Sequence, residues 1–423
     1  MQTIVRILLV AAAAALPNLA RTQEVTATLL DGSSIAGQLR EWRGENLIIV
    51  RANEEIRLQT EKLVSLRSSS PTPSAARDEA DGGLVELTDG TTLPIKEFET
   101  DETTAIVEID VPAPANQSTM TLPLKQVVAV RLERFDPAIE EQWEEIRSQS
   151  FASDVLVSIK RKSKSLDYHE GVLGDITPKK IGFEFDGETM RADRANVAGW
   201  VYFRKQPASE REPRCILHGH RGLRAAAADV RLSDQSLEIE TAAGVRFSWP
   251  LADVYFADFS AGKIVYLSDL KPALERWTPL VGLTVAAESA AKYGQVRLDQ
   301  SAFGGPLALR LRGSSASGSD IKTFSKGLAI RSRTELVYRL PPGFKQFVAI
   351  AGIEPVTSAT GDVQLLIHGD DRSLLTADVD GGQAPREIKL NIAGVKRLRI
   401  VVDFGQNLDT GDWLNLCEAR LIK

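Results

Sequence analysis

The sequence is poor in the residues from which most enzyme and nucleic-acid-binding sites are built. It has two cysteines and four histidines in 423 residues, and aromatic residues make up only 6%. No block of lysine and arginine offsets the net charge of −6, which argues against a surface that follows a phosphate backbone. There is no phosphate-binding loop, dinucleotide fingerprint or Gly-x-Ser-x-Gly motif. We therefore expect no nucleic-acid partner and no catalysis.

Long hydrophobic runs are also lacking, apart from one near the N-terminus. The stretch "ILLVAAAAAL" (7–16) follows Arg6 and is too short to anchor a protein in a bilayer. It predicts a signal peptide over residues 1–20, with Ala20 at the cleavage point. No later stretch is apolar enough for a transmembrane helix. We expect an exported protein without a membrane span, located in the periplasm or outside the cell.

The two cysteines leave two interpretations open. Export allows a disulfide between Cys215 and Cys417, but they lie in different predicted domains, so two buried thiols are the alternative. The segment "CILHGH" (215–220) also has the spacing of a soft-metal cluster. Because side chains alternate along a strand, these three are not expected to converge. His169 and His368 are isolated.

What the sequence does contain is a repeated β pattern. Val25–Leu39 and Gly83–Phe98 each place an Asp-Gly pair between two alternating runs, which is the favoured sequence for a tight hairpin. Two more strand-like runs and a similar closing strand follow each hairpin. The pattern predicts four small β units of about fifty residues. Their expected limits are 24–67, 83–134, 153–204 and 213–260.

The segments between these units are predicted from local signals. Residues 68–82 have the composition of a linker. Asp136-Pro137 is typical of a helix start and predicts a connecting helix over 136–150. Ile139, Trp143 and Ile146 would share one face of it and pack on a neighbouring unit. The units resemble Sm-like or SH3-like small barrels, which here implies a structural or protein-contact role.

The pattern changes at Gly262. Strict alternation marks three segments, around Val363–Ile367, Ile388–Ile392 and Leu398–Val402, and turn signals separate them. Regular strands without helical periodicity predict an antiparallel sandwich over 262–423. The expected fold class is all-β, with tandem small β-barrel or sheet units followed by a C-terminal jelly roll.

This C-terminal stretch resembles the NPCBM domain, a carbohydrate-binding type of module found beside family 98 glycoside hydrolases, and the family 51 carbohydrate-binding modules. The likeness rests on motifs in the family's order, including "GGPLAL" (304–309), "KGLAIRSRTELVYRLP" (326–341) and "GVKRLRIVVDFG" (394–405). Several positions depart from the family pattern. Ala329 replaces a glycine, Arg331 stands where the family has histidine, and Glu354 replaces an aspartate. The segment "DTGDW" (409–413) lacks the family's histidine, and "LNLCEA" replaces the acidic residue that follows the tryptophan.

The resemblance implies sugar binding by loops of the last domain. Trp413 could offer an aromatic face, while Asp412, Arg331 and Lys326 could bond to hydroxyl groups. The alternative is that Trp413 and Phe404 belong to the core of the sandwich.

The last loop is rich in oxygen donors. Asp403, Asn407, Asp409 and Asp412 fall within ten residues and are candidate calcium ligands. Their spacing is not that of an EF-hand, and a solvated turn in which these side chains bond the local backbone is the alternative. A glycosidase carboxylate pair is the catalytic alternative.

Together these features predict an exported, non-catalytic protein. Its last domain would bind a galactose-containing or related glycan, with the N-terminal units as spacer or as a surface for other exported or cell-surface proteins. Structural calcium is the one cofactor that the sequence suggests. The rival hypothesis is a structural or protein-interaction protein whose last domain has lost sugar binding, and a glycoside hydrolase is a distant third.

Overall fold

The structure is a computed structural model that describes residues 23–69, 82–111, 118–204, 211–280, 293–311 and 320–423. The predicted signal peptide and most of the predicted linker 68–82 lie outside these residues. The chain divides into two compact parts, which we call the N-terminal region (up to Ala261) and the C-terminal domain (Gly262–Lys423). Within the described residues, no helix has the length and apolar character needed to cross a membrane.

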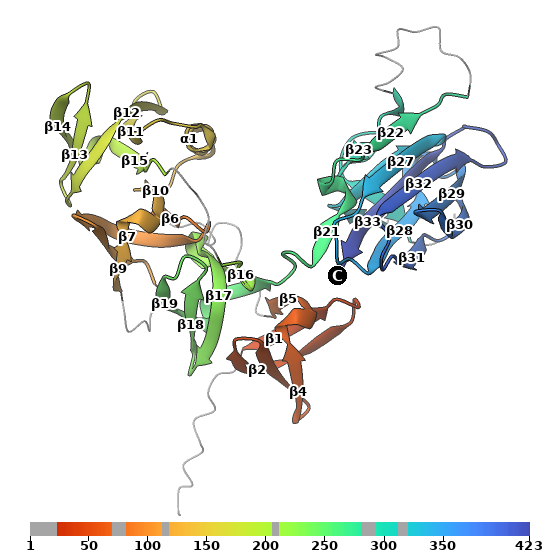
Figure 1. Cartoon of the computed structure of the whole chain (residues 1–423), viewed down its shortest axis with the longest axis horizontal. Coiled ribbons are helices and arrows are strands. Elements are labelled where there is room, and N and C mark those ends of the chain that lie inside the picture. Colours follow the sequence, from red (N-terminus) through yellow and green to blue (C-terminus); the bar gives the residue numbers. More distant parts are fainter. Residues whose placement is uncertain (1–22, 70–81, 112–117, 205–210, 281–292, 312–319) are drawn as a thin grey trace, which may run out of the picture. The chain divides into compact units, whose positions relative to one another are not determined.

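The N-terminal region consists of four five-stranded antiparallel units (Figure 1). The first unit contains β1 (Glu24–Leu29), β2 (Ser34–Arg43), β3 (Asn46–Arg51), β4 (Glu54–Gln59) and β5 (Leu63–Ser68). The second contains β6 (Gly83–Leu87), β7 (Thr92–Asp101), β8 (Thr104–Ile109), β9 (Thr119–Pro123) and β10 (Val127–Arg131). The third contains β11 (Asp154–Lys160), β12 (Ser165–Ile176), β13 (Lys180–Phe185), β14 (Glu188–Asp193) and β15 (Val197–Val201). The fourth contains β16 (Cys215–Gly219), β17 (Arg224–Ser233), β18 (Ser236–Thr241), β19 (Arg246–Pro250) and β20 (Val254–Asp258).

Each unit repeats one plan. The first strand pairs with the second and the fifth, and the second, third and fourth follow in order. A single 3-10 turn precedes every fifth strand, as at Thr60–Lys62 in the first unit. The Asp-Gly pairs do sit in the hairpin turns, where Gly32 and Gly90 have φ values of 88° and 78°. Such positive φ values favour glycine because it has no β-carbon.

The four units associate in two pairs through their fifth strands. In the first pair, β5 is hydrogen-bonded antiparallel to β20, which joins the first unit to the fourth. In the second pair, β10 is joined in the same way to β15, which unites the second and third units. The second and third units, which are adjacent in the sequence, therefore form an inner pair. The first and fourth units, which flank them in the sequence, form an outer pair.

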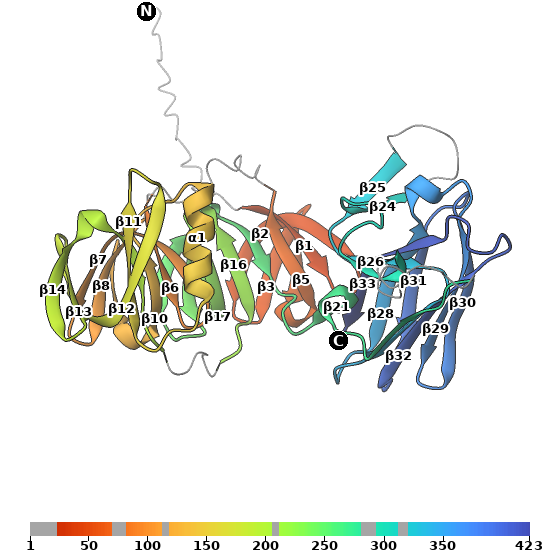
Figure 2. The same cartoon turned by 90° about the horizontal axis from the view of Figure 1, so that it is seen from above.

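Helix α1 (Pro137–Ser148) connects the second and third units and lies against the sheet that they share (Figure 2). Asp136 caps it by accepting a hydrogen bond from the backbone N–H of Ile139. Its buried face consists of Ile139, Trp143 and Ile146, the three residues predicted from their spacing. Gly199 of β15 makes room for the indole, because a β-carbon there would lie 2.8 Å from a ring atom of Trp143.

The C-terminal domain is a sandwich of two antiparallel sheets. One sheet has the order β23-β26-β33-β28-β31, and β21 (Ile264–Tyr266) also pairs with β33. The strands of this sheet are β23 (Arg297–Leu298), β26 (Gly327–Arg331), β28 (Gln346–Ile353), β31 (Arg386–Asn391) and β33 (Trp413–Ile422). The other has the order β22-β27-β32-β29-β30; its strands are β22 (Leu274–Trp277), β27 (Thr334–Arg339), β29 (Asp362–Gly369), β30 (Arg372–Asp380) and β32 (Arg397–Phe404). A separate hairpin pairs β24 (Leu307–Arg310) with β25 (Ile321–Phe324).

The core of the sandwich comes from the predicted alternation. Val363, Leu365 and Ile367 of β29 are buried, and the partners of Leu365 and Ile367 on β32, Val402 and Ile400, are buried beside them. Side chains at i, i+2 and i+4 share one face of a strand, so each sheet buries one side. The all-β architecture expected from the sequence is confirmed.

The disulfide that the sequence allowed is not formed. Among the described residues, Cys215 lies in β16 of the N-terminal region and Cys417 in β33 of the C-terminal domain, and each is fully buried in its own part of the chain. Burial also raises the pKa of the Cys417 thiol to about 12, so it stays a protonated, unreactive core group.

Candidate functional site

The structure brings Arg331 and Trp413 together at one end of the sandwich. Arg331 is the last residue of β26 and Trp413 is the first of β33, and the two are paired in register. Both side chains line a pocket of about 400 Å³. Asp409 and Thr410 of the preceding loop close one side, and Arg297, Tyr293 and Phe303 complete the wall.

Three aromatic rings shape this pocket. Trp413 is only 6% exposed and packs edge to face on Phe303, with ring centroids 6.4 Å apart. Phe303 and Tyr293 are 55% and 54% exposed, so much of each ring is open to solvent. Large apolar side chains left exposed around a concavity are typical of a binding surface.

Arg331 is the main polar group of the pocket. Its guanidinium carbon lies 4.5 Å from the ring centroid of Tyr293 and 5.6 Å from that of Trp413, so two aromatic rings hold it by cation–π contacts. Its Nη2 lies 3.5 Å from the Asp409 carboxylate and 3.4 Å from the Asp409 carbonyl oxygen. Both distances are at the outer limit for a hydrogen bond, which makes the pair loose.

A buried polar group supports the loop that carries Phe303. Glu354, which follows β28, accepts hydrogen bonds from the Ser301 hydroxyl at 2.9 Å and from the Asn415 amide at 2.8 Å. All three side chains are buried. Glu354 therefore fixes the 301–303 loop against β33 and positions Phe303 without lining the pocket.

Asp412 lies below the pocket and not in it. The side chain is fully buried and accepts a hydrogen bond from the backbone N–H of Asp362 at 3.2 Å. Burial raises the pKa of the Asp412 carboxyl to about 6, against the opposing effects of that hydrogen bond and of the Ser332 hydroxyl. Asp412 Oδ2 and Asp362 Oδ1 are among the buried side-chain oxygens of the described residues that have no well-formed hydrogen bond.

The four candidate calcium ligands do not form one ligand set. Asp403 bonds the backbone N–H of Phe404, Asn407 donates to the Thr360 carbonyl, and Asp409 faces Arg331. The Asp403 contact is the local backbone contact of the alternative interpretation, whereas the partners of Asn407 and Asp409 are distant in the sequence. Within the described residues, no group of three or more His, Cys, Asp or Glu side chains is arranged to hold a metal ion. Asp412 meets a different carboxylate, Asp362, and two carboxylates fall short of the six to eight oxygens that calcium takes.

Lys326 is not part of the pocket either. It precedes β26, whereas Arg331 ends that strand, and its ammonium group forms ion pairs with Asp269 and Asp299 at 2.5 and 2.8 Å. These two carboxylates raise the pKa of Lys326 to about 12. The lysine joins three segments of the domain.

The segment "CILHGH" (215–220) lies in the N-terminal region. There His218 and His220 pack on Tyr255, and Cys215 is buried in the core.

Sequence reasoning missed Tyr293, Phe303 and Arg297. They lie far from Trp413 in the sequence, and no motif marks them. Phe303 directly precedes the "GGPLAL" motif, so an aromatic residue beside a glycine turn was the one available signal.

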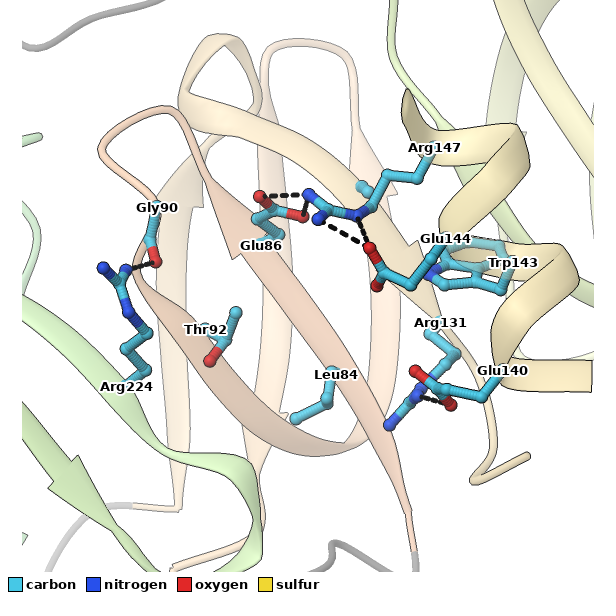
Figure 3. Close-up of a pocket in the computed structure, with 11 residues that line it drawn as sticks. Leu84, Glu86, Gly90, Thr92, Arg131, Glu140, Trp143, Glu144, Arg147 and Arg224 are labelled. Carbon is cyan, nitrogen blue, oxygen red and sulfur yellow. Dashed lines mark hydrogen bonds and ion pairs between the residues drawn. The ribbon is translucent and has the colours of Figure 1, made fainter. Parts of the chain in front are cut away.

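The N-terminal region has a second pocket, of about 290 Å³, between α1 and the β6–β10 sheet (Figure 3). Charged residues of both signs line it, but most of them pair with one another. Arg147 of α1 donates to both oxygens of Glu86 at 2.9 Å and also pairs with Glu144, while Arg131 pairs with Glu140. The pocket is therefore chiefly a set of ion pairs that joins the helix to the sheet, and we call this set the clasp.

Replacing Arg147 with methionine should test this clasp. Burial raises the pKa of the Glu86 carboxyl, and Arg147 opposes that shift. Without Arg147, the unfolding free energy at pH 7 should fall by about 1–2 kcal/mol, less than for a fully buried pair because both groups are partly exposed. Chemical denaturation should show a smaller loss at pH 4, where Glu86 is protonated. Lys160→Met, which removes an exposed pair with Asp167, should cost less than about 0.5 kcal/mol. Equal losses in the two variants would contradict the clasp.

Comparison with known proteins identifies the C-terminal domain. Residues 265–422 match the family model of the NPCBM/NEW2 domain, which confirms the resemblance seen in the sequence. No curated protein sequence matches the chain.

Three solved structures are similar to the chain. One is the CBM51 of a Clostridium perfringens GH95 protein in complex with methyl-galactose, at 21% identity and a TM-score of 0.31, covering 37% of this chain and 99% of that one. Another is the CBM51-2 and INT portion of Clostridium perfringens ZmpB in complex with GlcNAc, at 17% identity and a TM-score of 0.32, covering 46% of this chain and 37% of that one. The third is the tandem CBM51 modules of a Streptococcus pneumoniae family 98 glycoside hydrolase, at 10% identity and a TM-score of 0.31, covering 94% of this chain and 88% of that one.

Proposed function

We propose that the C-terminal domain binds a glycan in the pocket formed by Arg331, Trp413, Tyr293, Phe303 and Asp409. The observation that supports this proposal most directly is that two half-exposed aromatic rings, an arginine and a carboxylate line the same pocket. Aromatic faces suit the apolar C–H patches of a sugar ring, and planar charged groups suit its hydroxyls. The NPCBM/NEW2 match supports a carbohydrate-binding role.

In this proposal the protein is exported and non-catalytic, and acts in the periplasm or outside the cell. A galactose-containing or related glycan is the proposed ligand, since one structurally similar module was solved with methyl-galactose. The N-terminal units serve as spacer or as a surface for another exported or cell-surface protein. Their exposed apolar side chains, such as Val172 and Met190 of the third unit, favour the second role.

Alanine at Phe303 is expected to weaken glycan binding by about tenfold or more without lowering the melting temperature. The ring is half exposed, so its removal costs little folding energy but takes away a wall of the pocket. The full chain would be screened on a glycan array, and the best ligand titrated by calorimetry. Ile321→Ala, an exposed apolar residue of β25 outside the pocket, is the matched control.

If the folded protein binds no glycan on the array, the proposal is contradicted. That result would favour the rival hypothesis of a domain that keeps the fold without sugar binding. Binding that survives in Phe303→Ala would place the site elsewhere. Turnover of glycoside substrates by the chain would contradict the non-catalytic role.

A further inference from the structure

The charge of the pocket distinguishes between classes of sugar. Of the described residues that line it, Arg297 and Arg331 are cationic and Asp409 is anionic. Two buried acids, Glu354 and Asp412, are not among the described residues that line the pocket, although Asp412 is close enough for Arg331 to lower its pKa. Glu354 is engaged by Ser301 and Asn415, and Asp412 accepts a hydrogen bond from the backbone N–H of Asp362. The described lining of the pocket therefore holds two cationic side chains and one anionic one, in a protein whose overall charge is negative.

Arg331 is also under-paired for a buried cation. It is 8% exposed, its only contacts with oxygen acceptors given by the described residues are the two long ones to Asp409, and its Nε has no partner among them. A buried guanidinium held only by a long ion pair is incompletely satisfied, and a planar guanidinium matches a carboxylate with two parallel N–H donors. Tyr293 and Trp413 hold the group in place, so an incoming anion would meet a fixed donor.

We infer that the pocket selects an acidic sugar, one whose ring carries a carboxylate, over its neutral counterpart. This inference rests on the proposed glycan binding and names the class of ligand. The carboxylate would pair with Arg331 and the sugar ring would contact Phe303 and Tyr293. Displacing the loose Asp409 contact costs little, because that contact is already at the limit of hydrogen-bonding distance.

The test compares three ligands of the same size with the full chain. They are methyl galactoside, methyl galacturonoside and the carboxamide of the latter, which differ only at C6. The acid should bind about tenfold or more tighter than the amide, as expected for a hydrogen bond to a charged group. The preference should shrink when the salt concentration rises from about 0.05 M to about 0.5 M.

Variants assign the preference to a residue. Arg331→Gln should bind acid and amide about equally, and Arg331→Lys should keep part of the preference as well as the fold. Arg333→Gln is the matched control, since Arg333 lies over Phe404 and outside the pocket.

The outcomes separate the inference from the function on which it rests. Equal affinity of the wild-type protein for acid and neutral forms would overturn the inference and leave glycan binding intact. A preference that survives in Arg331→Gln would overturn the role of Arg331. Failure to bind any glycan on an array that includes acidic ones would overturn both.

Discussion

Replacing Trp143 with alanine is expected to lower the free energy of unfolding of the N-terminal region by about 3–5 kcal/mol. The indole is buried and sits among Phe135, Val155 and Ala198, where α1 covers the junction of the second and third units. Its loss removes the main anchor of the helix and leaves a cavity above Gly199. A twelve-residue helix is marginal in water by itself, so α1 should unfold locally.

Hydrogen exchange measured by mass spectrometry would follow this change, because it reports protection segment by segment. Protection should fall in α1 and at the β10–β15 junction, and stay unchanged in the C-terminal domain. Ile106→Ala, at an exposed position of β8, is the control. Gly199→Ala tests the same contact from the sheet side, since its β-carbon would lie 2.2 Å from the Val130 carbonyl oxygen. Unchanged protection of α1 in Trp143→Ala would refute the anchoring role.

Replacing Asp412 with asparagine is expected to stabilise the C-terminal domain by up to about 3 kcal/mol at pH 7. The pKa of the buried carboxyl is raised to about 6, so the folded domain holds a proton that the unfolded chain has released between about pH 4 and pH 6. Stability from this group is therefore full below about pH 4 and is lost as the pH rises through 6. An asparagine amide cannot ionise, and it can donate toward the Asp362 carboxylate that now repels Asp412.

Melting temperatures of the two proteins, measured from pH 4 to pH 7 in a chelator, would test this expectation. Their difference isolates Asp412 from the other titrating groups. The curves should converge near pH 4 and separate above pH 6. A variant that is less stable than the wild type at pH 7 would contradict the argument. Added calcium is the second arm: a rise in melting temperature for the wild type alone would mean that Asp412 and Asp362 hold a cation.

Local signals in the sequence predicted local structure well. The Asp-Gly hairpins, the Asp136-Pro137 helix start and the buried face of α1 all depend on neighbours in the sequence, and the structure contains them. The alternation of Val363, Leu365 and Ile367 likewise gave the buried face of β29. The pairing of β5 with β20 was not predictable, because no local pattern records which distant edge a strand will meet.

The candidate site shows the same limit. Trp413 and Arg331 were found from motifs, and the register of β26 and β33 makes them neighbours. Lys326 and Asp412 were placed in the site from the same resemblance, as polar groups for sugar hydroxyls. A strand carries Lys326 away from Arg331, and the alternation around β33 turns Asp412 inward. The acidic loop does not form one ligand set because Asp403, Asn407 and Asp412 bond to backbone groups, whereas the Asp409 carboxylate pairs with Arg331.

The nested pairing of the four units has a consequence for the order in which the chain folds. The second and third units are contiguous, so β10 and β15 can pair after a short search. Strand β5 must wait for β20, which lies beyond both inner units, and closing so long a loop costs more entropy. During synthesis the edge of β5 would stay open until the fourth unit has emerged. Such an edge can pair with another chain, so the outer pair is where misassembly between two newly made molecules should begin.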